Sequence, residues 1–413
     1  MVPPTQPALV EAEPELGLSE GMEYYEPEAG ACCDVPGGAC PQPGAYWGCQ
    51  GPCRPFSSLW GDRLWVRAES LLWWSQGMDT PPLVTTSPHG VEREDAGVLG
   101  RNTSVLFGGT GLATDIRGGA RFTLGYWLDP AHCLGWQASY LGLGDETDGF
   151  FGASEGDPIL ARPFFNVVSG EQDARLLTFD EVAEGWVRAN ATTRFQQLDV
   201  HVRRRLFENC PGGFDFLIGY QFNRLEDRLH VWDSSTSIAQ EGPVEPGTVV
   251  AVWDLFDTSN DFHGVDFGVI FEERLGCWTL ELAMNLALGN TRSRAAISGR
   301  TVTDVPGETP VTTAGGLLAL PTNMGSFEDN RFVMIPELGV TLGYDLTCRL
   351  KATVGYSFIY WSKVARPGGL IDMDVNPSQF SGGTLEGAPR PQFQWVTGDY
   401  WLQGVNLGLE YHF

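Results

Sequence analysis

Apolar and polar residues alternate along several long segments of this 413-residue chain. Between residues 350 and 360, every second residue is apolar, and most of the residues between them are polar or small. Successive side chains of a β-strand point to opposite faces, so this period of two predicts a strand with one apolar face. The run covers about eleven residues, which is the length of a tilted strand that crosses a bilayer.

Similar runs occur in pairs, and each pair surrounds a short polar break that contains a cysteine. The four cysteines are Cys133, Cys210, Cys277 and Cys348. With one unpaired run at each end of the series, the sequence predicts ten strands, at 62–75, 113–128, 134–145, 193–208, 213–231, 262–274, 277–296, 331–345, 348–364 and 399–413. Bacterial single-chain barrels have an even number of strands, and about twelve would result if residues 98–107 and another loop segment also paired.

The connections between the strands are short at one end of the predicted sheet and long at the other. The long ones cover 76–112, 146–192, 232–261, 297–330 and 365–398. Short turns on one side and long loops on the other are typical of outer-membrane barrels, whereas a soluble sandwich has shorter strands and mixed connections. We therefore expect an all-β fold, a closed antiparallel up-and-down transmembrane β-barrel in the cell outer membrane, with short periplasmic turns and long outer loops.

The composition excludes two other classes of protein and predicts a separate leader. No apolar run approaches the roughly 18 to 20 residues of a membrane helix. The net charge of −26 argues against nucleic acid, which is bound mainly through Lys and Arg, so outer-membrane lipid is the expected partner. Residues 1–58 are rich in Pro, Gly, Cys and acidic residues, and we expect a flexible leader there and the barrel at 59–413. The start of the chain lacks a basic region and an apolar core, so we expect an export signal to have been removed or to lie upstream.

Polar side chains on the inward faces of the strands are the candidate pore lining. The basic ones belong to the first, second and fourth strands and the acidic ones to strands five to eight: Arg67, Arg117, Arg121, Arg203 and Arg205, and Asp215, Asp266, Glu272, Glu281 and Glu337. A basic wall opposite an acidic wall would set a transverse field across a water-filled pore. Alternatively, the walls meet as ion pairs and close the lumen, because barrels of about eight strands are filled by side chains. The segment 146–192 would also block the pore if it folded in.

The nine cysteines favour an oxidising compartment. The four in the turns are disulfide candidates, and we expect them on one periplasmic rim together with both ends of the barrel. Neighbouring turns would be linked to each other or to the leader, but spacing along the sequence does not fix the connectivity. A zinc site needs two closely spaced ligand pairs, and the leader offers only Cys49 with Cys53, so we expect no metal and no cofactor.

Three classes of function fit this architecture. Histidines stand near acids at His201, His230 and His263, but none lies in a motif with a catalytic mechanism, so we expect no enzyme and place an outer-membrane hydrolase last. Acidic positions between the predicted strands, such as Asp145 and Asp254, are expected on solvated loops, through which a closed barrel would act as a structural or adhesive surface scaffold. The polar inward faces favour porin-like passive passage of small hydrophilic solutes, which is the first functional prediction.

Three segments resemble a known family. They are residues 65–74 (WVRAESLLWW), 118–127 (GGARFTLGYW) and 408–413 (GLEYHF). Over roughly residues 60–413, the chain resembles the putative beta-barrel porin-7 proteins of planctomycete-type bacteria. The resemblance implies an outer-membrane barrel whose porin role is itself inferred, with no known substrate and no catalytic residues. A last strand that ends on an aromatic residue, here Phe413, also resembles the signal by which the barrel-assembly machinery recognises outer-membrane proteins.

Overall fold

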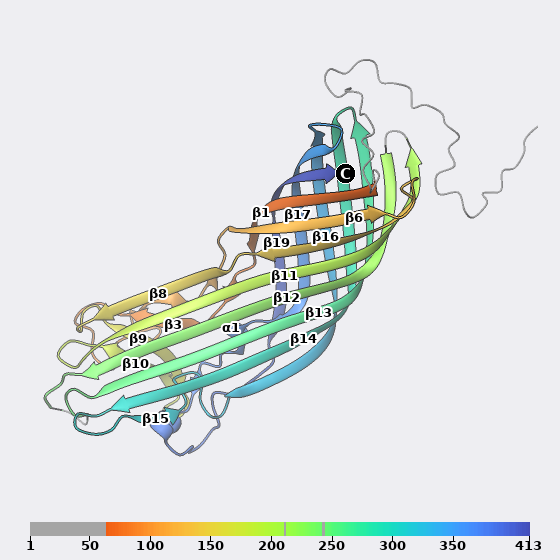
Figure 1. Ribbon diagram of the computed structural model, residues 1–413. Coiled ribbons are helices and arrows are strands. Elements are labelled where there is room, and N and C mark those ends of the chain that lie inside the picture. Colours follow the sequence, from red (N-terminus) through yellow and green to blue (C-terminus); the bar gives the residue numbers. More distant parts are fainter. Residues whose placement is uncertain (1–62, 210–211, 242–243) are drawn as a thin grey trace, which may run out of the picture.

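The computed structural model describes residues 63–209, 212–241 and 244–413, and its main feature is a closed ring of ten antiparallel strands (Figure 1). Around the ring, the strands are β1 (Leu64–Ser75), β6 (Arg117–Trp127), β7 (Leu134–Leu143), β11 (Ala183–Asn209), β12 (Gly212–Ser237), β13 (Val249–Leu275), β14 (Trp278–Asp304), β16 (Gly325–Asp345), β17 (Leu350–Ala365) and β19 (Thr397–His412). The ring closes where β19 pairs with β1. The predicted barrel of ten strands is confirmed. The predicted leader, residues 1–58, lies outside the described residues.

Strand β14 shows where the lipid-facing surface ends. From Trp278 to Leu286 the outward side chains are apolar and exposed, and from Asn290 onward they are mostly polar and include Arg292. The inward side chains change in the opposite sense, from polar to apolar and buried, as at Ile297. About eleven residues of a strand tilted by about 45° span about 25 Å, which is the height of the apolar band of an outer-membrane barrel. No helix in the described segments is long and apolar enough to cross a membrane.

Four strands continue far beyond this lipid-facing surface. Strands β11, β13 and β14 have 27 residues each and β12 has 26, and their distal halves form a curved sheet that leans away from the barrel (Figure 1). The prediction of a long loop at 232–261 is therefore wrong, because most of this segment is the end of β12 and the start of β13. The predicted bounds of these four strands end where the apolar residues change from the outward to the inward face. The backbone pairing continues beyond that point.

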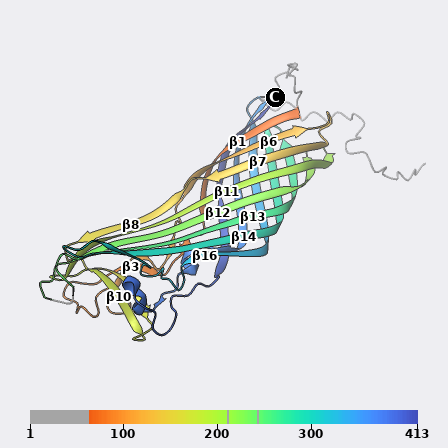
Figure 2. The same ribbon diagram turned by 60° about the horizontal axis from the view of Figure 1, so that its bottom comes forward.

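Segments between the other strands cover the inner face of this extension. Strand β8 (Glu146–Ser154) pairs with β11, and β15 (Val311–Ala314) pairs with β14. A second sheet of β10 (Glu171–Thr178), β9 (Leu160–Asn166), β3 (Pro82–Thr86) and β4 (Ser104–Gly108) packs against them, with β18 (Asp374–Val375) beside β9 (Figures 1 and 2). Residues 98–107, which would have made a barrel of twelve strands, thus contribute to this smaller sheet. The remaining short elements are β2 (Met78–Asp79), β5 (Gly111–Leu112), α1 (Pro367–Leu370) and η2 (Pro377–Gly382). We call the extended sheet and its covering layer the outer module.

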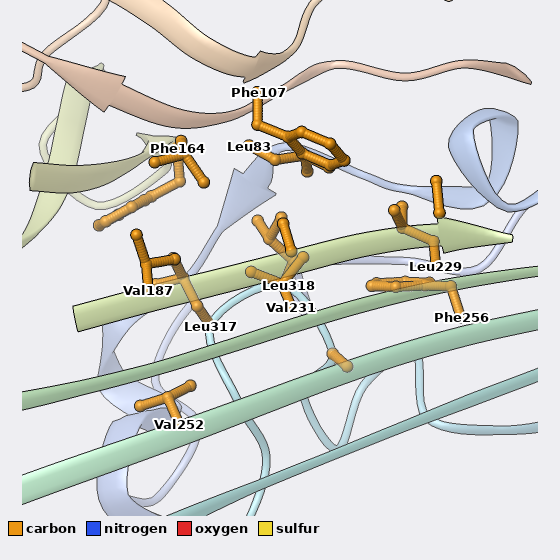
Figure 3. Packing of buried hydrophobic residues seen from close by; sticks show 14 of the residues in the cluster. Leu83, Phe107, Phe164, Val187, Leu229, Val231, Val252, Phe256, Leu317 and Leu318 are labelled. Carbon is orange, nitrogen blue, oxygen red and sulfur yellow. The ribbon is translucent and has the colours of Figure 1, made fainter. Parts of the chain in front are cut away.

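An apolar core holds the two layers of the outer module together (Figure 3). The long strands contribute Val187, Leu229, Val231, Val252 and Phe256, and the covering layer contributes Leu83, Phe107, Phe164, Leu317 and Leu318. A fully buried side chain of this size stabilises a fold by about 1.5–3 kcal/mol. The long connections that the sequence predicted are therefore largely an ordered layer with its own core.

A cluster of buried charges lies within this core. Arg162 of β9 lies 2.9 Å from Asp233 of β12 and 2.6 Å from Asp254 of β13, and none of these side chains is exposed. The carboxylate of Asp254 also accepts hydrogen bonds from the backbone N–H groups of Leu317 and Ala319. Burial lowers the pKa of Arg162, but the charges of the two carboxylates outweigh it and leave the pKa above its ordinary value. Asp254 was predicted on a solvated loop and is instead a buried strand residue that ties the covering layer to the sheet.

Candidate functional site

The interior of the barrel is the first candidate site, because all ten predicted pore-lining residues face it. They are Arg67, Arg117, Arg121, Arg203, Arg205, Asp215, Asp266, Glu272, Glu281 and Glu337, and each is buried or half-buried. The residues on either side of each one along the strand point away from the lumen. How these charges are paired decides between the two predicted states of the lumen.

Arg67 of β1 joins the two predicted walls. Its guanidinium donates to both carboxylate oxygens of Glu281 on β14, at 2.9 and 3.0 Å, and its Nε donates to Glu410 of β19 at 2.7 Å. Strands β16, β17 and β19 separate β14 from β1 in the ring, so this contact bridges the lumen. Glu410 in turn lies 3.6 Å from Lys351 and 2.8 Å from His412. The basic and acidic side chains therefore meet in the middle of the barrel.

Other predicted charges are paired with near neighbours. Arg203 and Arg205 both donate through Nε to Asp215 on the adjacent strand, at 2.7 and 2.8 Å. His201 Nε2 lies 2.7 Å from a carboxylate oxygen of Asp266 on β13. The predicted transverse field between two separate walls is therefore replaced by local ion pairs, as in the second predicted state of the lumen. The barrel is narrow enough for side chains on different strands to reach one another.

The polar space that remains inside the barrel is small. A cavity of about 140 Å³ lies among these side chains, and Arg121, Asp199 and Glu337 contribute to its lining. Gln197 of β11 donates to Glu337 of β16 across this cavity at 2.9 Å, and Arg121 lies 3.6 Å from Glu69.

A belt of apolar side chains closes the barrel between this cavity and the outer module. It consists of Leu71, Trp73, Leu141, Leu143, Phe195, Leu225, Phe262, Ala287, Val333, Ile335, Ile359, Trp361, Val364, Tyr400 and Leu402, and none of them is more than 5% exposed. They come from nine of the ten barrel strands. We call this set the lumen belt.

Aromatic rings meet across the lumen belt. The ring centroids of Phe195 on β11 and Tyr400 on β19 lie 6.3 Å apart, although β1, β6 and β7 separate these strands in the ring. Phe262 on β13 and Trp361 on β17 also have centroids 6.3 Å apart, and the Trp361 indole N–H donates to Thr291 of β14 at 3.0 Å. Side chains from opposite walls therefore fill the cross-section of the barrel at this level.

Arg366, which directly follows β17, adds a polar contact at the outer side of the lumen belt. Its Nε donates to the carboxylate of Asp227 on β12 at 2.9 Å, and its Nη1 donates to the backbone oxygen of Gln76 at 2.8 Å. Arg117 of β6 donates to the hydroxyl of Tyr400 at 2.9 Å. These bonds link three sides of the barrel mouth just outside the apolar side chains.

The lumen belt is not among the residues predicted from the alternation of apolar and polar positions, although the sequence contains a signal for it. Residues 71–74 and 400–402 are consecutive apolar residues, so the strict alternation fails at the outer ends of these strands. A strand that is apolar on both faces is covered by apolar groups on both sides, here by lipid outside and by other side chains inside. The segment 146–192, which would have blocked the pore by folding in, instead forms β8, β9 and β10 of the outer module and the start of β11.

The turns that contain Cys133, Cys277 and Cys348 lie on one rim, at the end of the barrel away from the outer module. The N–H of Asp345 donates to the backbone oxygen of Cys277 at 2.9 Å, and the N–H of Phe413 donates to that of Leu64 at 3.0 Å, which brings both ends of the barrel to this rim. Cys133, Cys277 and Cys348 are each disulfide-bonded. Cys210 lies outside the described residues.

The sequence matches a family model described as putative beta barrel porin-7, over residues 65–413. The chain belongs to this family. As a porin-7 barrel with an apolar lipid-facing surface, it resides in the cell outer membrane. No curated protein matches the chain.

Solved structures similar to this porin-7 barrel share little sequence with it. The outer membrane protease OmpT from Escherichia coli is 9% identical, with 85% of this chain and 97% of that chain covered and a TM-score of 0.41. The translocator domain of the autotransporter NalP from Neisseria meningitidis is 10% identical, with 86% and 89% covered and a TM-score of 0.22. An anion-selective porin from Comamonas acidovorans is 10% identical, with 85% and 98% covered and a TM-score of 0.19.

Proposed function

We propose that this porin-7 barrel is a closed outer-membrane anchor that holds the outer module at the cell surface. The lumen belt carries the proposal, because apolar side chains from nine strands fill the barrel between the polar cavity and the outer module. The outer module has an apolar core of its own and continues directly from four barrel strands. The short turns of outer-membrane barrels face the periplasm, so a module at the other end faces the cell exterior. Lipid is the partner of the barrel's outer surface, and catalysis is not part of the proposal.

A second candidate function is passive passage of small hydrophilic solutes. The family and the polar cavity inside the barrel favour it. In this case the lumen belt is a gate, and rings such as those of Phe262 and Trp361 must separate before a solute passes. Opening would expose apolar side chains to water, which costs about 25 cal/mol for each Å² of apolar surface.

Conductance of the full chain in planar lipid bilayers distinguishes the two functions. The anchor proposal predicts no current from the unaltered protein, once its insertion has been verified by the faster migration of unheated barrel on gels. Steady ohmic steps would contradict the anchor and support passage. The variants Arg121→Glu and Arg203→Glu then serve as the check, because they change the ion selectivity of a current that runs through the lumen and leave a leak around the barrel unchanged.

A further inference from the structure

The outer face of the extended sheet carries a straight row of aromatic and arginine side chains. Phe151 of β8 is paired with Arg188 of β11, and Arg188 is paired with Trp232 of β12. Trp232 is paired with Trp253 of β13, and Trp253 is paired with Arg300 of β14. Neighbouring strands are about 4.8 Å apart, so these five residues extend over about 19 Å. We call them the outer row.

Both arginines of the outer row stack on aromatic rings of the row, and Trp232 stacks on His230 beside it, with ring centroids 4.5 Å apart. The guanidinium carbon of Arg300 lies 4.4 Å from the centroid of the Trp253 ring, and that of Arg188 lies 5.3 Å from the Phe151 ring. Trp186 extends the aromatic surface, with its ring centroid 6.4 Å from that of Phe151. A surface hollow of about 450 Å³ lies over the two tryptophans of the row, Trp186, Arg188 and Phe151.

Among the described residues, the guanidinium groups of Arg188 and Arg300 have no acidic partner. Neither guanidinium forms a hydrogen bond or an ion pair there, and both side chains are exposed. Other outward arginines nearby are paired, since Arg228 lies 2.9 Å from Asp257 and Arg292 binds Glu328. A guanidinium stacked on a ring keeps its in-plane N–H donors free for a carboxylate, sulfate or phosphate group. The outer row therefore presents two cations, Arg188 between aromatic residues and Arg300 at the end of the row beside Trp253.

We propose that the outer row binds an acidic polysaccharide. The tryptophan rings would stack on the apolar faces of successive sugar rings, and the two arginines would bind acidic groups carried by the sugars. A single-stranded nucleic acid would also stack on such rings, so poly(dT) is used as a competing probe. The polysaccharide is favoured because the outer row faces the cell exterior in the proposed function. Lipid is the wrong occupant because Trp232 lies ten residues beyond Phe222 on β12, and Phe222 is near the outer edge of the lipid-facing surface.

This inference deepens the proposed function and rests on it, since the outer row must lie outside the membrane. The probes are polygalacturonate, alginate and dextran sulfate, with uncharged dextran as the neutral control, and binding is measured by calorimetry on the full chain in detergent. We expect at least one acidic polymer to bind and dextran to bind more weakly. Replacing Trp232→Ala and Trp253→Ala together should lower the affinity at least about tenfold, because each ring contributes stacking and burial. Replacing Arg188→Gln and Arg300→Gln should remove the preference for acidic polymers and the dependence on salt.

Two variants control for general effects of the substitutions. Trp395→Ala removes a partly exposed tryptophan outside the row, and Arg228→Gln removes an exposed arginine that already has a partner; both should bind as the unaltered protein does. The inference is overturned if none of the acidic polymers binds or if the row variants keep full affinity. It is also overturned if the row binds anionic lipid vesicles, poly(dT) or a second copy of the chain in preference to the polysaccharides. A current through the unaltered barrel would contradict the proposed anchor function. It would not contradict binding at the outer row, because that binding is measured separately.

Discussion

The guanidinium of Arg162 lies 2.6 Å from the carboxylate of Asp254, and neither side chain is exposed to solvent. Asp254 directly follows Trp253 along β13, so the two side chains point to opposite faces of the same sheet. The same holds on β12, where Asp233 binds Arg162 on the inner face and Trp232 belongs to the outer row. The charge cluster that holds the covering layer in place thus lies directly behind the proposed binding surface.

Replacing Arg162→Met should destabilise the outer module by about 3 kcal/mol, because Asp254 would remain buried without its cation, whereas Asp233 keeps its ion pair with Arg175. The barrel should be unaffected, since its lumen belt and ion pairs are separate from this cluster. Limited proteolysis of the full chain in detergent, together with migration of unheated protein on gels, measures the two parts independently.

The matched control for this change is Arg228→Met, which removes an arginine from the exposed ion pair with Asp257. Exposed pairs contribute at most about 1 kcal/mol, so this variant should be as resistant to protease as the unaltered protein. Equal resistance of the Arg162→Met variant would show that the buried cluster does not hold the covering layer.

The lumen belt can be opened by removing rings that meet across it. Replacing Trp361→Ala and Tyr400→Ala together should give measurable conductance in planar bilayers, because two of the largest fully buried side chains are removed from the cross-section. The control is Leu72→Ala, since Leu72 lies next to the belt in sequence but faces lipid and is 47% exposed. If the double variant inserts and remains closed, the belt is not the barrier. A separate barrier, such as the contacts of Arg366, would then have to be tested.

The sequence was sufficient to predict the ring of ten strands, because the physical constraint on a lipid-facing surface repeats along each strand. The outward side chains from Trp278 to Leu286 are apolar and exposed, as the outer surface of a barrel in the outer membrane requires. Beyond this surface the constraint reverses, since water lies outside and the module core lies inside. The period of two continues here, but the polar Arg292 points outward and the apolar Ile297 points inward. A strand predicted from one continuous apolar face therefore ends too early.

The pairing of charges in the lumen could not be predicted from periodicity. Arg67 and Glu281 are 214 residues apart in the sequence, and their contact depends on the width of the ring and the stagger of its strands. Alternation indicates that both side chains point inward, but not that they reach each other. The buried positions of Asp233 and Asp254 were missed for a similar reason, because their partner Arg162 comes from a segment whose strands are short and whose pairing is outside the barrel.

Replacing Arg67→Gln should destabilise the barrel, because Glu281 and Glu410 would lose the cation that lies between them. Breaking a buried ion pair costs about 3–5 kcal/mol, and access of water to the cavity places the expected value at the lower end. The readout is the temperature at which the protein loses the migration of the folded barrel on gels. Arg204→Gln is the control, since Arg204 is exposed on the outward face of β11, near the end of the strand. An unchanged transition temperature for Arg67→Gln would contradict the bridging role.

The disulfides on the periplasmic rim should connect neighbouring turns. Cys277 lies in the turn before β14 and Cys348 in the turn before β17, and these turns are adjacent because β14 pairs with β16. We therefore expect a bond between Cys277 and Cys348, and by the same argument one between Cys133 and Cys210, because β7 pairs with β11.

Peptide mapping without reduction tests this connectivity. In the Cys277→Ser variant, Cys348 should become open to alkylation while Cys133 stays protected. The loss of a link that closes a loop of about 70 residues should lower the free energy of unfolding by up to about 4 kcal/mol, measured by urea titration in lipid. A peptide that joins any of these cysteines to residues 1–58 would contradict the predicted pairing and would show instead that the leader is fastened to the rim.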